Sequence, residues 1–154
     1  MANISNSFPA CVKDLYFALH ITAISLSYAV FFVASLAALL YLIQDNNLKR
    51  KQWGSITSRL PDLSSLDRIN YRFIGLGFPV LTLAIIIGYL WAKEARGVYW
   101  NWNPREVSAL VLWFLYAIIL HVRLSSRLRG RKVALLSMLA FLVIVFTLFS
   151  NCRG

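Results

Sequence analysis

Four long apolar runs dominate the sequence and leave few folds open to it. They lie roughly at Leu15–Ile43, Phe73–Ala92, Val107–Val122 and Val133–Ser150. An α-helix needs about 20 residues to cross roughly 30 Å of hydrocarbon, so the first run is long enough to project beyond a bilayer and the third needs its flanking turn. The chain is 59% hydrophobic and only 14% charged, which excludes an ordinary soluble domain. We predict an all-α integral membrane protein with four transmembrane helices, forming a single transmembrane domain over residues 1–154.

Basic residues gather in two of the connecting segments. Of the 16 lysines and arginines, 11 lie between the first and second runs or between the third and fourth. The positive-inside rule places these segments on the inner face. Both termini and the loop VYWNWNPREV (98–107) are then expected on the outer, periplasmic or lumenal side. The formal net charge of +10 therefore reflects topology, and we expect membrane lipids and no nucleic acid as partners.

Two local patterns concern the second run and the segment before it. The stretch LPDLSSL places apolar residues on one face, which predicts a short amphipathic surface helix starting near Pro61–Asp62. The run itself opens with FIGLGFPV, where Gly75, Gly77 and Pro79 allow a kink or a close helix approach. The two cysteines, Cys11 and Cys152, fall near the two ends on the expected outer side. A disulfide and two separate interfacial cysteines both remain open there.

The tetrapeptide Asn103–Glu106 has the chemistry of a helix start. Asn103 is a favourable N-cap, and Pro104 suits the first helical position because it has no N–H to lose. Glu106, three residues after the cap, can reach back to the N–H of Asn103 and complement the helix dipole. The third apolar run is therefore expected to begin at this tetrapeptide.

Tyr99, Trp100 and Trp102 precede this cap and admit two interpretations. Aromatic side chains collect at membrane–water interfaces, so they can form an interfacial belt. They can also line a binding site for a large, flat, hydrophobic ligand. The residues alone leave both open.

The two histidines lie within or at the ends of apolar runs, where ionisable groups are costly and often functional. His20 is near the outer end of the first run and His121 near the inner end of the third, so about 20–25 Å should separate them. They cannot share one metal ion. Each is either an interfacial histidine bonded to a neighbouring helix or to headgroups, or an axial ligand of a separate haem. The sequence contains no catalytic constellation of its own: it has no protease triad, phosphate-binding loop or paired intramembrane carboxylates, and no C-x-x-C-H for covalent haem.

The order of these features resembles the C-terminal half of the CcsA/ResC type of cytochrome c biogenesis proteins, which handle haem through a tryptophan-rich WWD loop. The specific stretches are GFPVLTLAIIIGYLWA (77–92) and the YWNWNPRE core (99–106), and the likeness extends roughly from Leu15 to Ser150. The resemblance implies an inner-membrane or thylakoid protein that delivers haem to the outer face for attachment to apocytochrome c.

By this resemblance, haem b is the cofactor and two histidines are its iron ligands. His20 would be an external axial ligand and His121 a ligand of a deeper site. The loop residues would form the haem platform: Tyr99, Trp100, Trp102, Asn103, Pro104 and Glu106. The partners would be apocytochrome c and other biogenesis subunits, a CcsB/ResB-like protein or an N-terminal CcsA half. At most the chain would be one component of a haem lyase.

Three departures from the family pattern define an alternative. Arg96 stands where the first tryptophan of the loop is expected, and Asn103 stands where an aspartate is expected. A second external histidine, expected beyond the last apolar run, is missing, and Cys152 lies near its place. Another subunit would then complete each haem site. Otherwise the chain is a diverged WWD-family subunit with a structural or weak haem-binding role in a membrane redox or assembly complex.

Overall fold

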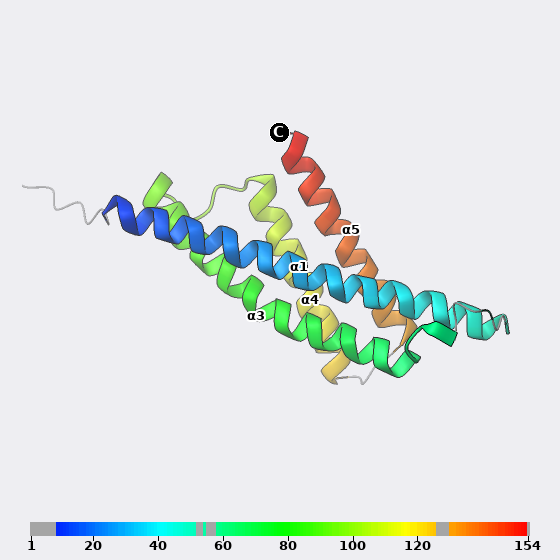
Figure 1. Cartoon of the computed structure of the whole chain (residues 1–154). Coiled ribbons are helices and arrows are strands. Elements are labelled where there is room, and N and C mark those ends of the chain that lie inside the picture. The colour runs from blue at the N-terminus through cyan, green and yellow to red at the C-terminus, as the bar shows by residue number, and fades with distance from the viewer. Residues whose placement is uncertain (1–8, 52–53, 55–57, 126–129, 154) are drawn as a thin grey trace, which may run out of the picture.

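The computed structural model describes residues 9–51, 54, 58–125 and 130–153, and four long helices account for most of them (Figure 1). These are α1 (Ala10–Lys49), α3 (Leu63–Arg96), α4 (Pro104–Ser125) and α5 (Arg131–Arg153). Each is long and apolar enough to cross a membrane. With 40 residues, α1 is about 60 Å long, roughly twice the hydrocarbon thickness. The predicted all-helical architecture with four candidate spans is confirmed.

The predicted surface helix near Pro61–Asp62 is not a separate element. Asp62 is the N-cap of α3, which starts at Leu63 and continues to Arg96 without a break. Its polar first turns therefore extend the second apolar run at one end of the bundle. The prediction of a separate helix was wrong for a physical reason. An amphipathic stretch that leads directly into a span can continue the same i to i−4 hydrogen bonds, so the two form one helix.

The core forms where α1, α3 and α4 meet around one aromatic pair. The rings of Phe31 and Tyr116 stack with centroids 3.7 Å apart, and both side chains are fully buried. Gly77 faces the same ring, since a Cβ at this position would lie 2.6 Å from Phe31 Cε1. The sequence expectation of a close helix approach at the FIGLGFPV stretch is therefore confirmed for Gly77.

A buried polar cluster ties α5 to α1 and α3. The Asn70 amide donates to the carbonyl oxygen of Ala34 at 2.7 Å and to Ser137 Oγ at 3.0 Å. Asn70 is 3% exposed and Ser137 is fully buried. An amide in an apolar bundle gains most from such bonds because water is absent, so this cluster fixes the relative positions of three helices.

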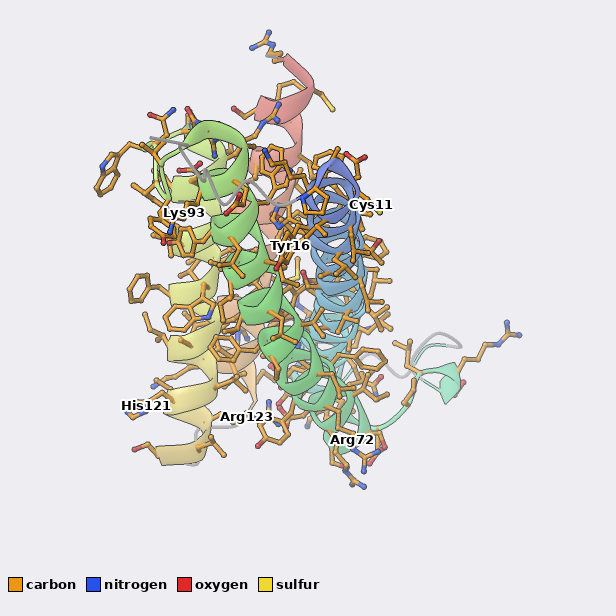
Figure 2. All side chains as sticks on the ribbon, turned by 90° about the vertical axis from the view of Figure 1, so that its left-hand side faces the viewer. Cys11, Tyr16, Arg72, Lys93, His121 and Arg123 are labelled. Atoms are coloured by element: carbon orange, nitrogen blue, oxygen red, sulfur yellow. The ribbon has the colours of Figure 1, made fainter. Side chains whose placement is uncertain are left out.

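The bundle has two chemically different ends. Figure 2 shows Cys11 and Lys93 near one end, and Arg72, His121 and Arg123 near the other. Since neighbouring helices run antiparallel, the start of α1 at Ala10 and the end of α5 at Arg153 both lie at the first end. Cys11 and Cys152 are exposed free thiols. The aromatic loop 97–103 lies at this end, away from the basic connections.

Candidate functional site

His20 is held by the backbone of α3. Its Nδ1 lies 2.8 Å from the carbonyl oxygen of Ala84, and its ring is half-buried. The ring also packs on Gly88, where an added Cβ would lie 2.7 Å from His20 Cε1. Residues i and i+4 of a helix share a face, so the missing side chain at Gly88 leaves the Ala84 carbonyl open to the imidazole. The glycine and the histidine thus form one structural unit although 68 sequence positions divide them.

This hydrogen bond decides which nitrogen of His20 can bind another group. A carbonyl oxygen only accepts, so Nδ1 of a neutral His20 carries the proton. Nε2 then keeps its lone pair and is the nitrogen free to coordinate a metal. Metal-binding histidines are generally oriented in this way. The ring nitrogen that does not bind the metal donates a hydrogen bond, which fixes both the tautomer and the direction of the ring. The ring of His20 is therefore held in one orientation, with Nδ1 engaged by α3.

Trp100 lies at the depth of His20 in the bundle. Its ring contacts Tyr89 of α3, with centroids 5.6 Å apart, and Tyr89 follows Gly88 directly. Trp102 meets Trp100 edge to face, also at 5.6 Å. The loop thus folds back along the last turns of α3 and brings an aromatic cluster to the level of the imidazole, on a neighbouring face of the helix.

The two loop tryptophans are presented differently. Trp102 is 77% exposed and has a left-handed backbone with φ of 46°, a conformation that costs a non-glycine residue on the order of 1–3 kcal/mol. Trp100 is half-buried, and its buried Nε1 has no hydrogen-bond partner among the described residues. Tyr99 packs its ring against Lys93 Nζ, 4.7 Å from the centroid. The loop therefore offers one free indole donor and one exposed ring to a ligand.

Glu106 fastens this loop to both helices. Helix α4 begins at Pro104 as predicted, and the carbonyl of Asn103 accepts the first helical bond from Val107. The predicted bond from the N–H of Asn103 to the Glu106 carboxylate is wrong, because both oxygens of this carboxylate accept from other groups. Its Oε2 accepts from the N–H of Asn101 at 2.9 Å, and its Oε1 accepts from Arg96 Nη2 at 2.8 Å. Arg96 is thus the anchor of the carboxylate.

Replacing Glu106 by alanine is expected to loosen the loop and leave the bundle folded. Hydrogen bonds to a charged group contribute about 1.5–3 kcal/mol, and the exposed ion-pair component contributes about 0–1 kcal/mol. Limited proteolysis should cut Glu106→Ala faster within 97–103 than the wild type. Arg96→Gln removes only the ion-pair component and should give a smaller increase. Equal cleavage of all three proteins would contradict the tether.

His121 lies at the other end of the bundle, on a different face. It is exposed on α4, and Figure 2 shows it on the side of that helix turned away from the other helices. Arg123, two residues on, pairs with Asp67 of α3, whereas His20 bonds to Ala84 of the same helix. At a rise of about 1.5 Å per residue the two histidines are therefore roughly 20–25 Å apart. The expectation that they cannot share a metal ion agrees with this geometry. Within the described residues no cluster of three or more histidine, cysteine or acidic side chains could hold a metal ion.

Sequence reasoning missed three parts of the site: the Ala84 carbonyl, Tyr89 and the Arg96–Glu106 ion pair. A signal for the first existed in IIIGYLWA, where a lone glycine interrupts an apolar helix. Such a glycine indicates that another group approaches the backbone closely. The sequence offered nothing to identify that group as His20, because the pairing depends on how α1 and α3 align.

The fold and the site define a class of protein: an all-helical membrane protein with an oriented histidine and an aromatic loop that contact neighbouring residues, Gly88 and Tyr89, of α3. A comparison with protein families finds that residues 3–152 match the model described as cytochrome C assembly protein. The chain belongs to this family.

Several curated relatives carry the name cytochrome c biogenesis protein CcsA. The protein of Chlamydomonas reinhardtii is 40% identical over 146 residues, covering 95% of this chain and 40% of its own length. The protein of Thermosynechococcus vestitus is 36% identical over 168 residues, covering 86% of this chain and 53% of its own. That of Pyropia yezoensis is 35% identical over 179 residues, covering 94% and 56%. The chain spans about half the length of the curated relatives it matches. No solved structure matches it.

Proposed function

We propose that this chain handles haem b in c-type cytochrome maturation, holding it at the outer face of the membrane beside the aromatic loop. The observation that carries the proposal is the bond from His20 Nδ1 to the Ala84 carbonyl at 2.8 Å. It leaves Nε2 as a ligand at the depth of Trp100. The name of the relatives, cytochrome c biogenesis protein CcsA, supports the same process.

The chain's own residues would bind and orient the cofactor. His20 would bind the iron, and the rings of Tyr99, Trp100 and Trp102 would hold the porphyrin. The unpartnered Trp100 Nε1 suits an acceptor on the ligand, such as a carboxylate. Asn103, Pro104 and Glu106 would act by fixing the loop. When bound, haem supplies the porphyrin that becomes attached to apocytochrome c through thioether bonds.

Partners complete this proposal. The two histidines lie too far apart to share one iron, so any second protein ligand for a haem at His20 would come from elsewhere. A CcsB/ResB-like subunit or an N-terminal CcsA half would supply it. His121 would likewise be one ligand of a second haem site deeper in the membrane, opposite a residue from a partner. In this arrangement the chain acts as a component of a haem lyase in the bacterial inner membrane or the thylakoid.

The test is the haem absorbance of the membrane-purified protein, alone and with candidate partners. Wild-type protein should show a Soret band, and His20→Ala should lose most of it because the oriented ligand is gone. His121→Ala is the matched control, with the same substitution at the opposite end of the bundle. It should retain the absorbance that depends on His20. A colourless wild-type protein that takes up no added haem, with or without partners, would contradict the proposal.

A second candidate function is a structural subunit of a membrane assembly complex, and the His20–Ala84 bond also favours it. A histidine that bonds to a neighbouring helix can serve only to join α1 to α3. His20→Gln separates the two roles, because the glutamine amide can donate to the same carbonyl but does not replace imidazole as an iron ligand. If His20→Gln recovers both the stability and the cytochrome maturation that His20→Ala loses, the structural role is correct. If it restores stability alone, haem ligation is correct.

A further inference from the structure

A cavity at the basic end of the bundle lies far from the aromatic loop and has no part in the proposed haem site. Its volume is about 760 Å³, and it is half-open to the outside. Three helices, α1, α3 and α4, and the turn at Gly130 meet there. Its lining residues are Tyr41, Leu63, Ser64, Asp67, Arg68, Tyr71, Arg123, Leu124 and Gly130. The size is in the range of small-molecule sites, about 300–1,000 Å³.

Arg123 is the buried cation of this cavity. Its side chain is 8% exposed, and its Nη2 donates to the Asp67 carboxylate at 2.6 Å and to the Asp67 carbonyl oxygen at 3.1 Å. The guanidinium lies over the ring of Tyr71, 4.5 Å from its centroid. Figure 2 shows Arg123 on the inner side of α4, toward α3. The group is therefore fixed in position before any ligand arrives.

Nη1 of Arg123 is buried and has no hydrogen-bond partner among the described residues. A buried donor on a charged group is costly to leave unpaired, so it indicates a missing acceptor. Asp67 already offsets the charge of Arg123, and Arg68 adds a second cation at the exposed rim. The lining thus carries a surplus of one positive charge, which a singly charged anion would balance.

The apolar part of the lining decides which anion fits. Leu124 is 68% exposed beside Arg123, and Leu63 and two tyrosines complete the walls. A free inorganic anion would leave this apolar surface in water. A phospholipid would cover it with its glycerol and upper acyl chains while its phosphate meets the arginines. Basic pockets between helices at the positively charged membrane face are suited to such headgroups.

We propose that this cavity, centred on Arg123, binds the headgroup of an anionic phospholipid. The phosphate oxygen accepts from the free Nη1 of Arg123, and Arg68 at the rim attracts the headgroup charge. Bound lipid would then join α3 to α4 at this end, beside the Asp67–Arg123 ion pair. The inference is independent of haem binding, and it holds or fails whatever the outcome at His20.

The test compares two arginines one helical turn apart on α3. Arg68 lines the cavity, whereas Arg72 does not, and both are exposed. Native mass spectrometry of the delipidated protein, titrated with phosphatidylglycerol or phosphatidylcholine, reports lipid retention. Wild type should prefer phosphatidylglycerol. Arg68→Gln should weaken that binding about fivefold, as expected for one basic residue at a lipid surface, while Arg72→Gln should stay within about twofold of wild type.

Two further arms make the outcome decisive. Arg123→Lys keeps the charge but removes the forked donor, so its preference for phosphatidylglycerol should fall while its α-helical content by circular dichroism stays the same. Inorganic phosphate at millimolar concentration should not raise the melting temperature as phosphatidylglycerol does. Equal losses in Arg68→Gln and Arg72→Gln would reduce the effect to general surface charge and overturn the site. Stabilisation by inorganic phosphate equal to that by the lipid would overturn the choice of ligand.

Discussion

Gly77→Ala is expected to destabilise the helix bundle by about 1–3 kcal/mol, the usual cost of overpacking a well-filled core. The new Cβ would lie 2.6 Å from Cε1 and 3.0 Å from Cδ1 of Phe31. The ring cannot retreat, because Tyr116 stacks on it at 3.7 Å with an interplanar angle of 7°. Either α3 moves away from α1 or the stacked pair separates, and both outcomes lose buried contact.

Gly75 provides the matched control on the same helix. Nothing lies within 4 Å of a Cβ added there, so Gly75→Ala should be neutral or stabilise α3 by up to about 1 kcal/mol through better helix propensity. Thermal melting or reversible unfolding in detergent would measure both variants. Equal stabilities for the two alanine variants would contradict the close packing of α1 on α3.

The sequence predicted the four membrane helices well because their signal is local. A run of about 20 apolar residues needs no partner to be recognised. The close approach at FIGLGFPV was predicted for the same reason, since a glycine in an apolar helix is visible in one segment. That Phe31 fills the space at Gly77 was not predictable. It depends on the register between α1 and α3, which is fixed by packing along their whole length.

In the candidate site, too, the local features were predictable and the contacts between helices were not. The start of α4 at Pro104 follows from the tetrapeptide Asn103–Glu106 itself. The bonds of Glu106 to Asn101 and Arg96 depend on how the loop folds back over α3, so they could not be predicted from the sequence. The haem roles of His20, His121 and the aromatic loop came from the family resemblance, and they stay predictions. The structure contributes the bond between His20 Nδ1 and the Ala84 carbonyl and the contact of Trp100 with Tyr89.

Gly88→Ala is expected to disrupt the candidate haem site although it replaces no proposed ligand. The added Cβ would lie 2.7 Å from Cε1 and 2.9 Å from Nδ1 of His20, so the imidazole must leave the Ala84 carbonyl. Losing the bond that orients a metal-binding histidine typically weakens affinity about 10–100-fold. Haem titration followed at the Soret band should show this loss in Gly88→Ala and not in Gly75→Ala. Unchanged haem affinity would mean that His20 does not ligate the iron in the orientation found here.

A double-mutant cycle on stability tests the same contact without haem. In the wild-type background Gly88→Ala should cost about 1–3 kcal/mol, because the new methyl displaces a packed ring. In the His20→Ala background the ring is absent, so Gly88→Ala should cost nothing further and can gain up to about 1 kcal/mol from helix propensity. The difference is the coupling energy between the two positions. Additive effects on the free energy of unfolding would mean that His20 does not contact Gly88. Strong coupling with unchanged haem affinity would mean that the contact serves only to pack α1 against α3. Only coupling together with a weakened Soret titration assigns Gly88 the role of holding an iron ligand in position.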